Sequence, residues 1–193
     1  MKRIFIILSI ILSSTFANAQ IGIGLRDNNY IYSYYKINDK WEVKYEHSVF
    51  AEKFGFQYFR VNASYIFNKK NFMLKLTPYY GQIYNAGFYN CGISAMSNLL
   101  LKNWFNFYIQ LNPHYDSGYD YNTCCKVGVG FKVHRDLLVV AAYSNIPEYR
   151  KTDDRLRMGL IFKSGNLRVK PILSIPLVKP KSIRILTSID YLF

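Results

Sequence analysis

The stretch SIRILTSIDYLF, residues 182–193, decides the fold. Its residues of one parity are mostly apolar, namely Ile183, Ile185, Ile189, Tyr191 and Phe193. Its residues of the other parity include the polar side chains of Arg184, Ser188 and Asp190. Successive side chains of a β-strand point to opposite faces, so this alternation predicts a strand with one apolar and one mostly polar face.

This stretch resembles the final strand of bacterial outer-membrane β-barrel proteins, which typically ends in Phe with apolar residues at alternate positions before it. The resemblance implies that the chain lies in the bacterial outer membrane, in contact with its lipid. It also implies that Ile189, Tyr191 and Phe193 form an assembly signal recognised by the barrel-assembly machinery. The resemblance covers one strand and indicates a general class, without a subfamily.

Residues 1–19 form a segment of a different kind. Lys2 and Arg3 precede the apolar run of residues 4–12, and Ala17-Asn18-Ala19 is a small-x-small cleavage site. This order is typical of a secretory signal peptide. We therefore expect export and cleavage after Ala19, which leaves residues 20–193 as a single barrel domain.

Twelve candidate strands follow the signal peptide, and no stretch has the apolar period of a helix. They cover residues 20–26, 30–36, 41–50, 54–67, 71–83, 87–100, 104–114, 124–133, 137–145, 155–163, 167–177 and 182–193. The sequence therefore predicts an all-β fold: a single antiparallel up-and-down transmembrane β-barrel of about twelve strands, with ten or fourteen as alternatives. A secreted β-sandwich also alternates, but the long apolar faces and the aromatic residues near strand ends favour the membrane barrel.

The connections between these strands differ on the two sides. Those expected on the periplasmic side are short, at residues 37–40, 68–70, 101–103, 134–136 and 164–166. Two nine-residue connections, 115–123 and 146–154, fall on the exterior side. Short periplasmic turns and longer external loops are typical of outer-membrane barrels.

Two strands depart from the regular pattern. Pro171 lies within strand 167–177, and because proline cannot donate a hydrogen bond to the neighbouring strand, it predicts a bulge there. Strand 137–145 is apolar on both parities, which predicts that its side chains fill part of the lumen.

The face expected to line the lumen is mostly basic. Its basic residues are Lys44, Arg60, Lys75, Lys126, Lys132, Arg155, Arg157, Lys163, Arg168, Lys170 and Arg184, and its acids are Glu42, Glu46 and Asp190. Rings of Arg and Lys set anion selectivity in pores, so one hypothesis is a narrow pore or uptake channel for a small anionic solute. The alternative is a structural or surface-interaction barrel whose closed lumen is filled by its own side chains.

Other chemistry finds little support in the sequence. Cys91 could pair with Cys124 or Cys125 in an oxidising compartment, leaving one thiol over, and no metal-ligand spacing is present. His47 has the outward parity that a membrane-embedded lipid-modifying enzyme would need, but the neighbouring Ser48 has the opposite parity. We assign no catalytic residue and no cofactor, and we expect no nucleic-acid partner because the basic residues follow no such motif. The oligomeric state is left open.

Overall fold

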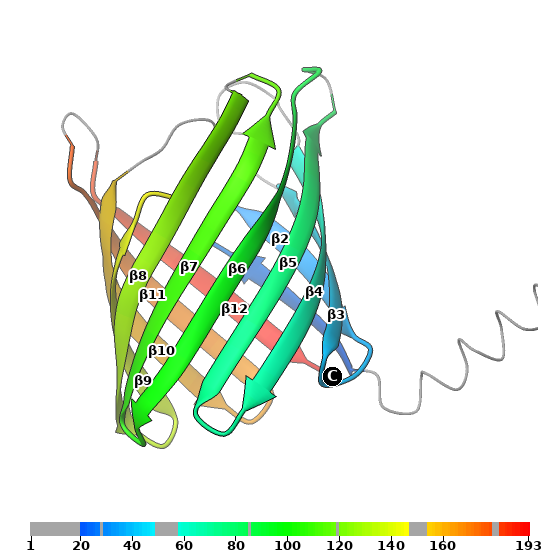
Figure 1. Cartoon of the computed structure of the whole chain (residues 1–193). Coiled ribbons are helices and arrows are strands. Elements are labelled where there is room, and N and C mark those ends of the chain that lie inside the picture. The colour runs from blue at the N-terminus through cyan, green and yellow to red at the C-terminus, as the bar shows by residue number, and fades with distance from the viewer. Residues whose placement is uncertain are drawn as a thin grey trace, which may run out of the picture.

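The computed structural model describes residues 20–27, 29–48, 58–84, 86–118, 120–146, 154–178 and 182–193. Twelve strands form a closed antiparallel barrel (Figure 1). They are β1 (Gln20–Arg26), β2 (Tyr30–Lys36), β3 (Trp41–Ser48), β4 (Tyr58–Lys69), β5 (Phe72–Ile83), β6 (Tyr89–Lys102), β7 (Phe105–Asp116), β8 (Asp120–His134), β9 (Leu137–Ser144), β10 (Arg155–Ser164), β11 (Leu167–Pro176) and β12 (Arg184–Leu192). The predicted all-β barrel of twelve strands is confirmed, whereas the signal peptide expected at residues 1–19 lies outside the described residues.

Every strand pairs with its neighbours in the sequence, and β1 pairs with β12 to close the ring. The main-chain N–H of Phe193 donates to the carbonyl of Ile21 across 2.8 Å, so Gln20 and Phe193 lie at the same end of the barrel. We call this end the inner end and the opposite end the outer end. No helix in the described ranges is long and apolar enough to cross a membrane.

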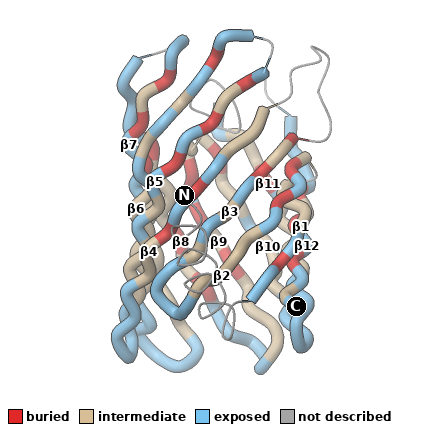
Figure 2. The backbone as a smooth tube through the Cα atoms, turned by 90° about the vertical axis from the view of Figure 1, so that its right-hand side faces the viewer, coloured by how far each residue is buried: buried red, intermediate tan, exposed pale blue. Residues whose placement is uncertain are grey.

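Side chains alternate between the outside of the barrel and its lumen, as the period of two requires. Along β1, Ile21 and Ile23 are 51% and 48% exposed on the outside. On the lumen side of the barrel, Ser64, Ser144 and Ser174 are fully buried. Figure 2 shows this alternation as buried and exposed stretches that follow one another along the strands. An apolar exterior around a polar interior is the reverse of a water-soluble fold and suits a barrel surrounded by lipid.

Glycines on the lumen face make room for tyrosine rings. Gly22 lies opposite Tyr34, and Gly24 lies opposite Tyr32. A Cβ atom at Gly22 would fall 2.1 Å from the ring of Tyr34, so the ring occupies the space that a side chain would need. Gly128 stands in the same relation to Tyr108. These rings therefore lie along the wall and leave the axis of the barrel open.

Pro171 is accommodated without the predicted bulge. The pairing of β10 with β11 keeps the same register on both sides of Pro171, since Gly159 pairs with Ile172 and Phe162 pairs with Val169. A Cβ atom at Gly159 would lie 2.3 Å from the carbonyl oxygen of Pro171. The expected bulge is therefore wrong: a glycine on the neighbouring strand lets the Pro171 backbone approach closely.

The outer hairpin between β7 and β8 is also tighter than predicted. Residues 115–123 were expected to form a nine-residue loop, but the ladder continues through Tyr115 with Tyr121 to Asp116 with Asp120. Cross-strand side-chain contacts stabilise this extension, because the rings of Tyr115 and Tyr121 are 5.6 Å apart. The other predicted long loop follows β9, and residues 147–153 of it lie outside the described part of the chain, as do residues 49–57 after β3.

The three cysteines are free thiols. Cys91 and Cys125 face outward on β6 and β8, with β7 between them, and Cys124 is fully buried on the lumen side. Cys91 lies opposite Tyr115 and Cys125 lies opposite Leu111, so the two are about 10 Å apart across the strands and farther along them. A disulfide requires Cα atoms within about 7 Å, so neither pairing of Cys91 forms.

Thiol labelling tests this arrangement. We expect the refolded protein to retain three free thiols after mild oxidation, because no two of these side chains can meet. A maleimide should modify exposed Cys91 first and buried Cys124 only after unfolding, as measured by mass spectrometry. Loss of two thiols on oxidation, with an intramolecular bridge identified by proteolysis, would contradict the strand positions. The Cys91→Ser variant serves as the labelling control.

Candidate functional site: the barrel lumen

The lumen contains a cavity of about 1100 Å³ that runs through most of the barrel. Seven of the predicted basic lumen residues line it: Lys44, Arg60, Lys75, Lys126, Arg157, Arg168 and Lys170. The predicted acids Glu42 and Glu46 line it as well. In total, eight cationic and four acidic side chains line the cavity. The cavity is therefore polar and carries an excess of positive charge.

The remaining predicted basic residues lie elsewhere. Lys132 lines a smaller cavity at the inner mouth. Arg155 is only 2% exposed and contacts Ser174, with 3.4 Å between Nη1 and Oγ. Lys163 and Arg184 are exposed near the two ends of the barrel. Parity predicts the face on which a residue lies, but height along the barrel decides whether it reaches the cavity.

A buried carboxylate joins two cations on one side of the lumen. Glu46 on β3 is 1% exposed. Its carboxylate lies 2.6 Å from Lys44 Nζ and 3.3 Å from Arg26 Nη2, which comes from β1. Because β2 separates β1 from β3, this pair of contacts spans three neighbouring strands. Glu46 therefore neutralises part of the wall near the outer half of β1 to β3.

Two further carboxylates pair with cations of other strands, Glu42 of β3 with β5 across the intervening β4 and Asp190 of β12 with the adjacent β11. Lys75 Nζ lies 2.8 Å from Glu42 Oε1. Asp190 on β12 forms ion pairs with two cations of β11. Its Oδ2 atom lies 2.7 Å from Lys170 Nζ and 3.9 Å from Arg168 Nη1. The predicted acids Glu42, Glu46 and Asp190 are thus all engaged with cations that face the lumen. The charges of these cations are partly compensated inside the protein.

Arg60 and Lys126 are held differently. Arg60 Cζ lies 3.6 Å from the ring centre of Tyr79, and Lys126 Nζ lies 5.4 Å from that of Tyr108. Cations over aromatic faces are attracted by the ring quadrupole. Among the described residues neither cation forms an ion pair with a carboxylate. Neither cation is therefore held in direct contact with a carboxylate, and both can interact with a solute inside the lumen.

Cations from different walls also act on one another across the lumen. Lys170 on β11 interacts electrostatically with Lys44 on β3 and with Lys126 on β8. Arg157 on β10 acts likewise on Lys126. The middle of the lumen is therefore a region where positive side chains converge from several strands. An anion placed there would meet opposite charges on more than one side.

The wall formed by β9 to β11 carries apolar side chains as well as cations. Leu138, Val140 and Ala142 of β9, Ile161 of β10 and Ile172 of β11 all line the cavity. We call these five residues the aliphatic strip. The strip agrees with the apolar residues on both parities of strand 137–145. It lies across the lumen from the polar wall of β4, because β10 stands six strands from β4 in the closed order.

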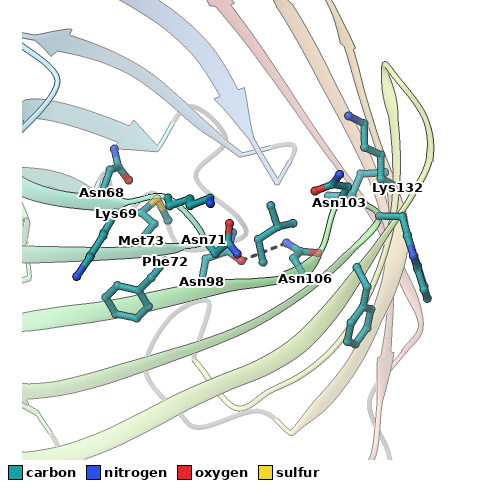
Figure 3. Close-up of a pocket in the computed structure, with 14 residues that line it drawn as sticks. Asn68, Lys69, Asn71, Phe72, Met73, Asn98, Asn103, Asn106 and Lys132 are labelled. Carbon is teal, nitrogen blue, oxygen red and sulfur yellow. Dashed lines mark hydrogen bonds between the residues drawn. The ribbon is translucent and has the colours of Figure 1, made fainter.

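A second cavity, of about 370 Å³, lies at the inner mouth (Figure 3). In this view Lys132 and Asn103 stand on one side, and Asn68 and Met73 stand on the other. Between them the side chain of Asn106 donates to Asn98 Oδ1 across 3.3 Å. Asn98, Asn106 and Leu138 also line the main cavity, so the two cavities adjoin. Register shifts in β6 and β8 occur at this level, at residues 100–102 and 132–134.

Comparison with known proteins identifies the architecture. No protein-family model matches the sequence, and a search of curated proteins finds no relative. Among solved structures, the KdgM porin in complex with disordered oligogalacturonate matches with a TM-score of 0.68 at 9% identity, over 90% of this chain and 97% of that one. The chain has the fold of bacterial outer-membrane porins. The Omp33 outer membrane protein of Acinetobacter baumannii matches with a TM-score of 0.55 at 9% identity, over 91% and 96%. The NanC porin matches with 0.52 at 10% identity, over 90% and 97%.

Several lumen residues of this porin fold were not singled out in the sequence. Arg26 shares the inward parity of Gly22 and Gly24, so the same alternation could have identified it. Tyr79 and Tyr108 also have inward parity, but nothing in the sequence indicates that their rings contact Arg60 and Lys126. Such contacts depend on strand tilt and register, which single-strand patterns do not contain.

The porin fold separates the two residues considered for lipid chemistry. His47 faces outward, with its ring 6.1 Å from Tyr84 and 6.4 Å from Tyr45. Ser48 is buried on the lumen side, where its Oγ accepts the main-chain N–H of Tyr58 at 2.8 Å. The two side chains lie on opposite faces of the wall and cannot act together. Within the described ranges no group of three or more His, Cys, Asp or Glu side chains could hold a metal ion.

Proposed function

We propose that this protein is a narrow outer-membrane channel whose lumen favours small anions. The observation that carries the proposal is the cavity of about 1100 Å³ lined by twice as many cationic as acidic side chains. Arg60 and Lys126 form no direct ion pair with a carboxylate of the described residues, and the protein around the lumen strengthens their field. The alternative of a filled lumen is disfavoured because tyrosines and aliphatic side chains lie against the wall over glycines.

The structural comparisons also support a channel that favours anions. The KdgM porin, which shares this fold, was solved in complex with oligogalacturonate. Each galacturonate unit carries a carboxylate, so that ligand is an anion. We propose that the outer membrane is the location of the present chain, that cleavage follows Ala19, and that Ile189, Tyr191 and Phe193 act as its assembly signal. The outward exposure of these three side chains supports recognition by another protein during insertion.

Planar-bilayer recordings test the channel. We expect discrete currents from the purified protein, with a reversal potential in a salt gradient that indicates preference for anions. The variant Arg60→Gln with Lys126→Gln should lower the anion-to-cation permeability ratio about thirtyfold at low salt. This estimate takes roughly 0.5 kcal/mol for each unit charge about 8 Å from a permeating ion in water, and the two lost charges change the energies of anion and cation in opposite directions.

A matched variant separates lumen charge from total charge. Lys40 lies exposed in the inner turn between β2 and β3, so Lys40→Gln removes a charge outside the lumen. We expect that variant to keep the wild-type permeability ratio. Absence of current at every salt concentration would refute the channel. An unchanged ratio in the double variant would refute the role of Arg60 and Lys126.

A further inference from the structure

The aliphatic strip is continuous across three strands. Leu138 of β9 pairs directly with Ile161 of β10. Val140 pairs with Gly159, which in turn pairs with Ile172 of β11. The five side chains of the strip therefore form one continuous apolar surface inside a lumen whose other walls are mostly polar. Such a surface in contact with water is costly unless a ligand covers it.

The strip covers the wall and does not block the lumen. A Cβ atom at Gly159 would lie 2.6 Å from Cδ1 of Ile172, and one at Gly130 would lie 3.3 Å from Cδ1 of Leu138. These aliphatic chains thus extend sideways over glycines of the neighbouring strands. All five residues still line the open cavity, so a solute inside it can touch the strip.

Cations border the strip at both of its ends. Arg157 lies opposite Ala142 across β9 and β10, toward the outer end. Lys132 lies opposite Leu138 across β8 and β9, toward the inner end. The five residues from Leu138 to Ala142 extend over about 13 Å. The wall therefore offers an apolar stretch of this length with a positive charge beyond each end.

This arrangement selects against a solute that is polar on every face. Aliphatic side chains provide no hydrogen-bond partner, so a hydroxyl placed against the strip would lose its bond to water. An alkyl group would instead remove apolar surface from water on both sides. Charge alone does not distinguish these solutes, because both can carry a carboxylate.

Resting on the channel function proposed above, we propose that the preferred solute is an amphipathic carboxylate. Its alkyl body contacts the aliphatic strip, with Val140 and Ile161 at the centre, and its carboxylate binds the cations at the border. Val140, Ile161 and Ile172 thereby determine specificity among anions of equal charge. Galacturonate, which bears hydroxyls around its ring, serves as the hydrophilic comparison.

Titration of the chloride current in planar bilayers provides the test. Butanoate, hexanoate, octanoate and galacturonate are added separately, and the concentration that halves the single-channel current is recorded. We expect this concentration to fall about twofold to fourfold for each added methylene, since a fully buried CH₂ contributes about a fourfold change in affinity. Galacturonate should bind no more tightly than butanoate.

Two variants assign the effect to the strip. Val140→Thr keeps the side-chain shape, Ile161→Thr shortens the side chain by one carbon atom, and both add a hydroxyl, so the dependence on chain length should disappear. Met96→Gln changes another apolar side chain that lines the cavity, on β6, and should keep that dependence.

The outcomes distinguish this inference from the channel itself. Wild-type protein without current refutes the channel. Normal current with equal block by butanoate and octanoate, or tighter block by galacturonate than by octanoate, refutes the amphipathic solute and leaves the channel standing. Persistence of the chain-length dependence in the double Thr variant refutes the role of the strip. If that variant fails to fold, the wild-type series decides the question.

Discussion

Replacing Glu46 by Gln is expected to lower the free energy of unfolding by about 2 kcal/mol. The carboxylate of Glu46 is buried and contacts both Lys44 and Arg26, so its loss leaves two cations without their partner. The expected loss lies below that of a fully buried pair because the side chains of Lys44 and Arg26 remain 21% and 32% exposed. Unfolding of the refolded protein in lipid or detergent by urea, followed by tryptophan fluorescence, measures the change.

Glu42→Gln is the matched control for this prediction. It removes the same charge from the lumen, but Glu42 pairs with Lys75 alone and both side chains are more exposed than Glu46. We expect it to cost less than about 1 kcal/mol. Both variants should raise the preference for anions. Equal losses of stability in the two variants would show that the contact of Glu46 with two cations adds no stability beyond that of a single ion pair.

The second large effect is expected at the seam between β1 and β12. A Cβ atom at Gly24 would lie 2.5 Å from the main-chain oxygen of Ile189. Gly24→Ala therefore forces the two strands apart, and we expect a loss of about 3 kcal/mol, at the upper end of overpacking effects. At Gly22 the three atoms nearest to the added Cβ all belong to the side chain of Tyr34, which can move, so Gly22→Ala should cost about 1 kcal/mol.

A double-mutant comparison separates the two causes. Tyr34→Ala should relieve most of the cost of Gly22→Ala, because the ring is the obstacle. Tyr32→Ala should leave the cost of Gly24→Ala in place, because the carbonyl of Ile189 remains. Each comparison uses the difference in unfolding free energy between single and double variants. Full relief of Gly24→Ala by Tyr32→Ala would contradict the backbone contact at the seam.

Much of the fold could be predicted because every strand carries its own period-two pattern. In segments 155–163 and 182–193, the alternating apolar residues are enough to predict a strand and to predict which of its faces points outward, without information from any other strand. The sequence does not predict a strand at residues 120–123, because Asp120 and Asn122 are of types that favour turns. Their strand conformation depends on pairing with β7, which extends to Asp116. The bulge predicted at Pro171 is wrong for a similar reason. The regular strand tolerates this proline because Gly159 on the neighbouring strand leaves room for the Pro171 backbone.

The lumen could be predicted only in part. Parity placed Arg155 and Arg157 on the same face, yet Arg155 is buried in the wall while Arg157 lines the cavity. Contacts such as Glu46 with Arg26 join strands that are not adjacent in the sheet. They follow from tilt, curvature and side-chain length together. A pattern read along one strand contains none of these quantities.

The ladder between β1 and β12 also bears on the order of folding. It joins residues 22–25 to residues 189–192, whereas every other ladder connects strands that follow one another in the sequence. Closing so large a loop has a higher entropic cost than forming any hairpin. We therefore expect the sheet of successive hairpins to form first and the ring to close last. Its rate of closure should then limit the appearance of the native barrel, and slow refolding in Gly24→Ala would report that step directly.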